Sequence, residues 1–169
     1  MIISILNCDR NFGIGKKNGL LFTLPIDMKF FKDTTLNHVV CMGENTLLSF
    51  PGSSPLPKRI NVVLSSDRKH NYEGVINVHS FKKFLKVIKK YSKKEDVFII
   101  GGASIYNQTL EYVDKVYLTK VDADGEAEVF FNNLDKNSNF KLVEESKPIL
   151  DGKYPIKFLT YINLNKKKI

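Results

Sequence analysis

The sequence predicts an α/β fold in which a mostly parallel sheet is covered by helices on both faces. Short apolar runs rich in β-branched residues alternate with amphipathic segments over most of the chain. Most of these runs are apolar on both faces, which is typical of strands buried between two layers of helices. The last third differs, because two strand-like segments flank an Asp151-Gly152 turn signal. We therefore expect the sheet to end in an antiparallel hairpin.

The individual elements follow from the same patterns. Strands are expected at residues 2–8, 39–42, 60–64, 75–78, 97–100 and 115–121, with hairpin strands at 140–148 and 154–163. Helices are expected at residues 26–36, 45–49, 81–91 and 103–111. Pro25 suits the first turn of the first helix, where its missing N–H costs nothing. The helix at 81–91 is basic and amphipathic, and we interpret its apolar stripe as a packing face rather than a membrane-binding surface.

The length and composition indicate one domain. A chain of 169 residues with 43% apolar residues can fill one core and leaves no comfortable room for two. We expect a single domain over residues 1–163, followed by a frayed basic tail at 164–169. No apolar run reaches the ~18 residues of a membrane span, and the N-terminus lacks signal-peptide features, so we expect a cytoplasmic protein.

The net charge of +8 is the most unusual compositional feature. It is compatible with a nucleic-acid, membrane or phosphorylated partner. However, 23 of the 26 cationic residues are lysines spread along the chain, a bias that an AT-rich genome also produces. Cys8 and Cys41 lie in apolar runs and are expected to be buried thiols. The three histidines have no metal-ligand spacing, so we expect no metal site.

Asp27 is the first candidate for chemistry. In the expected first helix, Asp27 shares a face with Phe30 and Phe31. Because an aspartate is rarely buried without a partner, two interpretations stay open. Either Asp27 caps the helix start, as the segment alone favours, or it meets a donor-rich ligand in an apolar cleft.

Three glycine-containing segments are the other candidates. Gly101-Gly102 joins an apolar strand to a helix, an arrangement that can expose helix N–H groups to a phosphate. Gly43 stands between a strand and a helix in the same way. The loop at 13–20 follows the first strand and has the glycines of a mobile flap. Each signal is weak alone.

Their order along the chain is specific. The chain contains, in sequence, Gly13-Ile14-Gly15, Leu24-Pro25-x-Asp27-x-x-x-Phe31, Met42-Gly43-x-x-Thr46, Pro57-Lys58-Arg59-x-Asn61-Val62-Val63-Leu64-Ser65, Ile100-Gly101-Gly102-x-x-Ile105-Tyr106 and Tyr117-Leu118-Thr119-x-Val121-Asp122-Ala123. This series resembles dihydrofolate reductase over residues 1–162. The resemblance implies a three-layer fold with a central, mostly parallel eight-stranded sheet and four flanking helices. It also implies a cytoplasmic enzyme of one-carbon metabolism that reduces dihydrofolate with NADPH and binds antifolates.

The resemblance also assigns residues. Asp27 would hold the pterin and assist protonation of its N5, and Thr119 would hydrogen-bond to Asp27. The substrate pocket would comprise Ile5, Met28, Phe31, Phe50 and Ile100, with Arg59 on the glutamate α-carboxylate. The peptide between Gly101 and Gly102 would be cis. The residues implied to bind NADPH are Asn7, Ile14, Gly15, Asn18, Gly19, Leu20, Gly43, Asn45, Thr46, Leu64, Ser65, Ser66, His79, Gly101, Gly102, Ala103, Ser104, Ile105 and Tyr106.

The chain departs from the family pattern at several positions. Phe22 stands where a Trp is usual, and Asn7 replaces a small apolar residue. Glu44 and Ser104 stand where a cofactor-binding Arg is common. Because a carboxylate repels the 2′-phosphate of NADPH, we expect a narrower preference for NADPH over NADH. The candidates that remain to hold this phosphate are Ser65, Ser66, Arg68, Lys69 and His79.

Two other functions share some of these sequence features. A reductase of riboflavin biosynthesis shares the fold and uses NADPH, but it lacks the early helical acid and the folate-facing Arg that Asp27 and Arg59 represent. A basic nucleic-acid-binding module would need exposed aromatic residues among its lysines, whereas the aromatics here follow the packing periodicity. We expect small-molecule ligands, no nucleic acid, no membrane and a monomer.

Overall fold

A computed structural model describes residues 1–17 and 19–169. The strands are β1 (Ile2–Cys8), β2 (Gly13–Gly15), β3 (Val39–Gly43), β4 (Ile60–Leu64), β5 (Ile76–Val78), β6 (Val97–Gly101), β7 (Lys115–Val121), β8 (Val129–Phe130), β9 (Phe140–Glu145), β10 (Ile149–Asp151) and β11 (Tyr154–Asn163). The helices are α1 (Pro25–Thr35), α2 (Glu44–Ser49), α3 (Phe81–Ser92) and α4 (Ala103–Thr109), with 3-10 turns at Pro51–Ser53, Leu110–Tyr112 and Leu134–Lys136.

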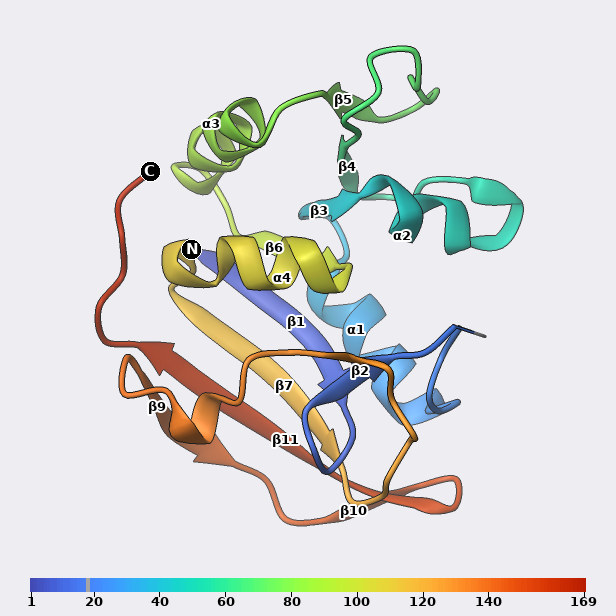
Figure 1. The fold of residues 1–169 in the computed structure, drawn as a ribbon, viewed down its shortest axis with the longest axis vertical. Helices are drawn as coiled ribbons and strands as arrows, with labels where there is room; N and C mark the ends of the chain where they lie inside the picture. Colours follow the sequence, from blue (N-terminus) through green and yellow to red (C-terminus); the bar gives the residue numbers. More distant parts are fainter. Residues whose placement is uncertain (18) are drawn as a thin grey trace.

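The main sheet is mixed and mostly parallel. Its order is β10-β11-β7-β1-β6-β3-β4-β5, with β9 also paired to β11 (Figure 1). The pairs from β7 through β1, β6, β3 and β4 to β5 are all parallel, and the pairs made by β11 are antiparallel. The expected parallel sheet with an antiparallel C-terminal part is confirmed.

Alternation along the central strands divides the core into two layers. Ile2 and Leu6 belong to one buried cluster, which includes residues of α3 and α4. Ile3 and Ile5 point the other way into a second cluster, which includes residues of α1 and α2. Successive strand side chains alternate between faces, so both faces of the sheet are covered and the three-layer arrangement is confirmed.

The C-terminal strands differ in detail from the expectation. The expected strand at 140–148 ends at Glu145 as β9, and a separate short strand, β10, follows it; both pair with β11. Pro148 lies in the gap between them and cannot donate a ladder hydrogen bond. Ser146 instead pairs with Phe158 through both its backbone N–H and its hydroxyl. The expected turn is present, with Gly152 at φ 62° between β10 and β11.

The basic tail is docked, so the expectation of a frayed end is wrong. Lys166 pairs with Asp114 at 3.0 Å, and the Lys167 N–H donates to the Glu111 carbonyl at 2.8 Å. Ile169 packs against the core cluster on the α3 side, and the C-terminus ends close to α3 in Figure 1. An apolar last residue and backbone hydrogen bonds therefore hold this segment despite its charge.

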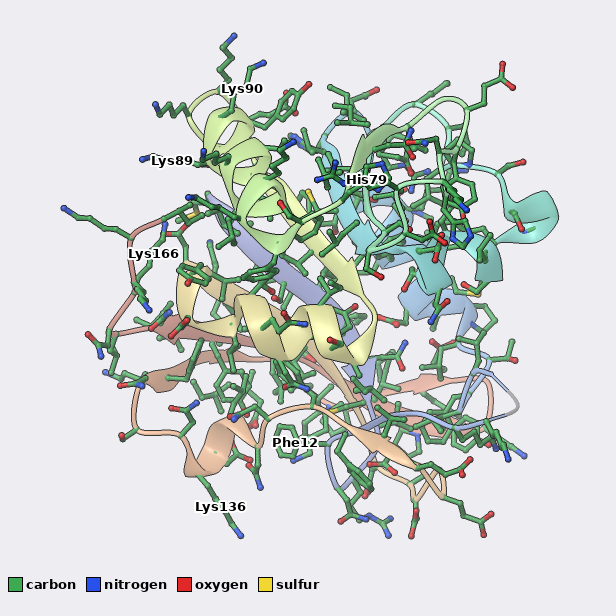
Figure 2. The ribbon with its side chains drawn as sticks, turned by 45° about the horizontal axis from the view of Figure 1, so that its top comes forward. Phe12, His79, Lys89, Lys90, Lys136 and Lys166 are labelled. Carbon is green, nitrogen blue, oxygen red and sulfur yellow. The ribbon has the colours of Figure 1, made fainter. Side chains whose placement is uncertain are left out.

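The helix α3 packs as expected. Phe84 and Ile88 are buried, whereas its lysines are exposed, and Lys89 and Lys90 extend outward in Figure 2. Cys8 and Cys41 are buried free thiols, as predicted. Burial raises the pKa of Cys8 to about 12. Within residues 1–17 and 19–169, the helices are too short or too polar to cross a bilayer.

Candidate active site

The Asp27 carboxylate lies in a buried position between α1 and the sheet. Its side chain accepts a hydrogen bond from the Thr119 hydroxyl at 2.7 Å and another from the Asn7 amide at 3.1 Å, one on each oxygen. Asn7 and Thr119 are paired residues of the neighbouring strands β1 and β7. Asp27 is only 8% exposed, so it makes these hydrogen bonds in a largely buried place.

Burial decides the acidity of this group. Desolvation raises the pKa of Asp27 above its ordinary value, and the hydrogen bonds from Thr119 and Asn7 oppose the shift. The negative charge of Asp151 raises the pKa further. Asp27 therefore exchanges its proton at a higher pH than an exposed aspartate does.

A second acid, Asp151, caps the helix that carries Asp27. No side chain from α1 or its N-cap residue Leu24 caps the helix start. Instead, Asp151 accepts hydrogen bonds from the backbone N–H groups of Ile26 and Asp27, each at 3.0 Å. Asp151 is fully buried and comes from β10. Of the two interpretations of Asp27, the capping one is wrong, because Asp151 has that role.

Most of the residues expected in the substrate pocket come together. Ile5 and Ile100 are buried in the cluster beside α1, and the rings of Phe31 and Phe50 pack against it. Met28 lies next to Asp27 in sequence but is 62% exposed, outside this cluster. Arg59 lies near the end of α1, where its guanidinium donates to the Thr35 hydroxyl at 3.2 Å and to the Pro57 carbonyl at 3.0 Å. These two bonds fix the guanidinium at the C-terminal end of α1.

The glycine segments meet where β3 and β6 end. Met42 of β3 is paired with Gly101 of β6, and the peptide between Gly101 and Gly102 is cis, as the resemblance implies. A Cβ on Gly101 would lie 3.1 Å from the Thr46 hydroxyl, and the φ of Gly101 is +132°. Only glycine fits this position without strain.

The two helices that begin here present open ends. Neither α2 nor α4 has a side chain that caps its first turn. Their first backbone N–H groups lie beside glycines that leave room for close approach, and such groups bind phosphate oxygens. Tyr106 is a supporting residue, because its buried hydroxyl donates to the Ile5 carbonyl at 2.8 Å. The uncapped N–H groups at the starts of α2 and α4 therefore fit a phosphate-bearing cofactor.

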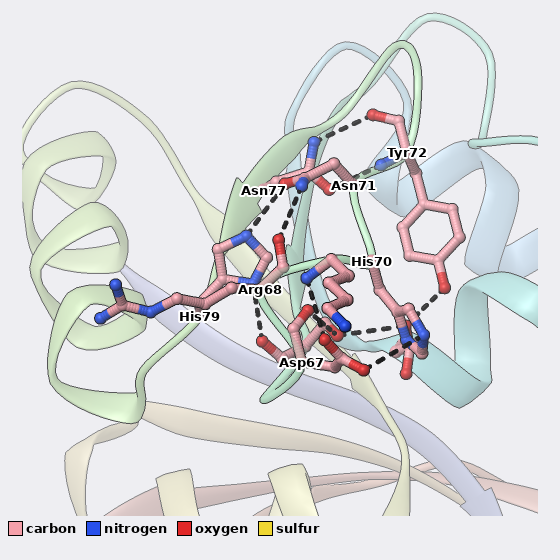
Figure 3. Close-up of polar contacts among 10 residues, drawn as sticks. Asp67, Arg68, His70, Asn71, Tyr72, Asn77 and His79 are labelled. Carbon is pink, nitrogen blue, oxygen red and sulfur yellow. Dashed lines mark hydrogen bonds and ion pairs between the residues drawn. The ribbon is translucent and has the colours of Figure 1, made fainter.

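A polar cluster follows the neighbouring strand, β4. Ser65 is buried, and its hydroxyl donates to Glu44 at 3.1 Å. His79 contacts the Ser65 carbonyl at 2.8 Å and the Asn71 side chain at 2.9 Å (Figure 3). Arg68 extends to the opposite side from Tyr72 in Figure 3, and its guanidinium makes no ion pair in the described part of the chain.

The loop at 13–20 is partly ordered by a short ladder. Gly13 and Gly15 in β2 pair with β8, and Lys17 donates its N–H to Glu128 at 2.7 Å. Ile14 is half-buried, whereas Leu20 is 79% exposed. Asn18, an expected cofactor residue, lies outside the described residues.

Sequence reasoning missed Asp9 as well as Asp151. Asp9 is 1% exposed and accepts hydrogen bonds from the N–H groups of Asn11, Gly13 and Gly125. It therefore ties the glycine loop to the segment before β8. An Asp just before a glycine loop favours an Asx turn, here the bond from the Asn11 N–H two residues on, and that signal could have suggested the first part of this role.

Comparisons with known proteins agree on one family. The family model described as dihydrofolate reductase matches residues 1–163. The dihydrofolate reductase of Bacillus subtilis strain 168 is 36% identical over 170 residues, covering 99% of this chain and 98% of the relative. That of Enterococcus faecium is 32% identical, covering 98% and 99%.

The structural comparison supports the same conclusion. The solved dihydrofolate reductase of Enterococcus faecalis, complexed with NADP(H) and RAB-propyl, has a TM-score of 0.86 and 30% identity, covering 96% of each chain. The sequence match, the fold and the arrangement around Asp27 point to one conclusion. The chain belongs to the dihydrofolate reductase family.

Proposed function

We propose that Asp27 controls the proton in the reaction of this chain, which is the NADPH-dependent reduction of 7,8-dihydrofolate to 5,6,7,8-tetrahydrofolate. The observation that carries the proposal is the buried carboxylate held by Thr119 and Asn7. General acid-base catalysis is most efficient when the pKa of the group lies near the working pH, and burial moves Asp27 in that direction.

The carboxylate has acceptor capacity left for the substrate. Each ionised oxygen can accept about two hydrogen bonds, and each oxygen of Asp27 already accepts one from the chain. We infer that the free positions accept from N3 and the 2-amino group of the pterin. This contact orients the ring and stabilises a proton on it, which Asp27 helps to deliver to N5 through a water.

The neighbouring residues then define the rest of the substrate site. Ile5, Ile100, Phe31 and Phe50 surround the pterin and the benzoyl ring with apolar side chains and exclude water. Arg59 binds the glutamate α-carboxylate, since a guanidinium presents two parallel donors to a carboxylate. Its bonds to Thr35 and Pro57 orient it before substrate arrives.

The cofactor site lies across the ends of β3, β4 and β6. When bound, NADPH supplies the hydride that reduces the pterin. We assign its pyrophosphate to the open first turn of α4 after Gly101 and Gly102. Ser65 and His79, which lie beside β4, are assigned to the adenosine half.

The proposal is tested with Asp27→Asn, measuring loss of nicotinamide absorbance with dihydrofolate and NADPH. The amide keeps the shape but removes the charge and the exchangeable proton. We expect hydride transfer at neutral pH to fall by about 100-fold or more, with little change in NADPH affinity. Asp33→Asn is the matched control, because Asp33 is an exposed acid on the same helix and, among the described residues, pairs with Lys29 alone.

Two results would contradict the assignment. One is parental turnover in Asp27→Asn, which would separate Asp27 from the chemistry. The other is an equal loss of rate in Asp33→Asn, which would show that the rate depends on the net charge of α1 rather than on Asp27.

A further inference from the structure

One oxygen of Glu44 is surrounded by three donors. Tyr72 donates its hydroxyl to Oε2 at 2.5 Å, His70 Nδ1 lies 2.7 Å from the same oxygen, and Ser65 donates its hydroxyl at 3.1 Å. A carboxylate only accepts hydrogen bonds, so His70 must carry its proton on Nδ1. Ser65 directly follows β4, and the other two come from the loop before β5 (Figure 3).

The three donors form a site suited to an anion, and the Glu44 carboxylate occupies it. Two hydroxyls and an imidazole N–H converging on one point are donors suited to a phosphate oxygen as well as a carboxylate. The hydrogen bond from Tyr72 is the largest of the effects that hold the pKa of Glu44 below its usual range. Glu44 is therefore ionised at neutral pH, although its side chain is only 22% exposed.

The two fixed cations of the loop before β5 do not pair with Glu44 in the described part of the chain. These cations are Arg68 and Lys69. Asp67 adds a second carboxylate, 3.4 Å from the other nitrogen of His70. The other Glu44 oxygen, Oε1, accepts no hydrogen bond from the described residues.

We propose that Glu44 is a specificity-determining residue that narrows the preference of this chain for NADPH over NADH. It occupies the donors of Ser65, His70 and Tyr72 that the 2′-phosphate of NADPH would otherwise use. It also leaves Oε1 free to accept a hydrogen bond from the ribose 2′-hydroxyl of NADH. The inference rests on the proposed placement of the adenosine half beside Ser65 and His79.

Two physical effects act in the same direction. A phosphate carrying nearly two negative charges is repelled by a fixed carboxylate, and it must also break one or more of the three hydrogen bonds to gain their donors. A ribose hydroxyl instead donates a hydrogen bond to a carboxylate. Acidic residues accept such a bond at the adenine-ribose sites of NAD-dependent proteins. Arg68 and Lys69 still attract the phosphate, so NADPH remains the better cofactor.

The test measures binding of two cofactor fragments by calorimetry, without catalysis. Adenosine 2′,5′-bisphosphate carries the discriminating phosphate, and 5′-AMP lacks it. Glu44→Gln should bind the bisphosphate more tightly by roughly fivefold or more at low salt. The affinity for 5′-AMP should change less, because the Gln amide keeps an oxygen that can accept from the 2′-hydroxyl. Added salt should shrink this gain, because it screens the repulsion that the variant removes. Glu44→Ala should show a gain in bisphosphate affinity of the same sign, and it should bind 5′-AMP more weakly because it removes the oxygen that accepts from the 2′-hydroxyl.

Glu73→Gln is the matched control. Glu73 is exposed in the same loop, next to Tyr72, and removing its charge should leave the fragment ratio nearly unchanged. A gain in bisphosphate affinity as large in Glu73→Gln as in Glu44→Gln would overturn the proposal, since the effect would then come from the net charge of the loop. Unchanged bisphosphate affinity in both Glu44 variants would overturn it too.

The fragment calorimetry and the Asp27→Asn rate assay together separate this inference from the catalytic assignment. A parental rate in Asp27→Asn would contradict the proton role of Asp27. It would not affect the predicted gain in bisphosphate affinity of Glu44→Gln. Unchanged bisphosphate affinity in both Glu44 variants, together with normal dihydrofolate reduction by the parent, would contradict only the role of Glu44.

Discussion

Replacing Asp151 with alanine should destabilise the protein strongly, because this residue caps α1 from the opposite end of the chain. Its two oxygens accept hydrogen bonds from Ile26 and Asp27 in a fully buried place. Each hydrogen bond to a charged group is worth about 1.5–3 kcal/mol, and losing a helix cap costs about 0.5–2 kcal/mol. Relief of the repulsion with Asp27 offsets part of the loss.

We therefore expect Asp151→Ala to lower the free energy of unfolding by about 2–4 kcal/mol. In a chain of this size the melting temperature should fall by about 5–15 °C. Urea unfolding followed by circular dichroism measures the change. Asp124→Ala is the control, because Asp124 is exposed and, within the described part of the chain, accepts from one backbone N–H, that of Glu126. A loss in Asp151→Ala no larger than in this control would refute the capping argument.

Three further predictions concern the site. Asn7→Ala should raise the pKa of Asp27 further, because it removes a donor that stabilises the ionised form; ¹³C NMR of the Asp27 carboxyl carbon measures this, and an unchanged or lowered pKa would contradict it. Arg59→Lys should weaken dihydrofolate binding by about 1–3 kcal/mol but spare a pterin lacking glutamate; equal losses for both ligands would make Arg59 structural. Gly13→Ala should loosen the β2–β8 ladder, because the new Cβ would lie 2.3 Å from the Ala127 Cβ; unchanged amide exchange in β2 would show that the loop adapts.

The sequence predicted the sheet well because its signals are local. The strand segments of β1, β4 and β7 have the same bounds in the structure as in the expectation. Asp27 stood out for a similar reason, as an acid that shares a helix face with Phe30 and Phe31. Local periodicity carries both kinds of information.

The partners of these residues could not be predicted in the same way. Asp151 lies 124 residues beyond the N–H of Asp27 that it caps, and only the strand order brings β10 to the start of α1. Ser65, His70 and Tyr72 are spread over a loop whose conformation no periodic pattern describes. The sequence therefore indicated that Glu44 repels a phosphate, but not that three donors converge on it. Docking of the tail likewise depends on Ile169 reaching the α3 side of the core.

The most direct test of the account is the single-turnover rate of hydride transfer in the parent and in Asp27→Asn, measured across the neutral and acid range by stopped flow. We expect a large deficit in the rate of the variant at neutral pH that narrows as the pH falls, because solvent protons increasingly replace those that Asp27 controls. The variant should be at least as stable as the parent, since the amide carries no charge to desolvate. A variant rate equal to that of the parent throughout the neutral range would contradict the central claim that Asp27 controls the proton.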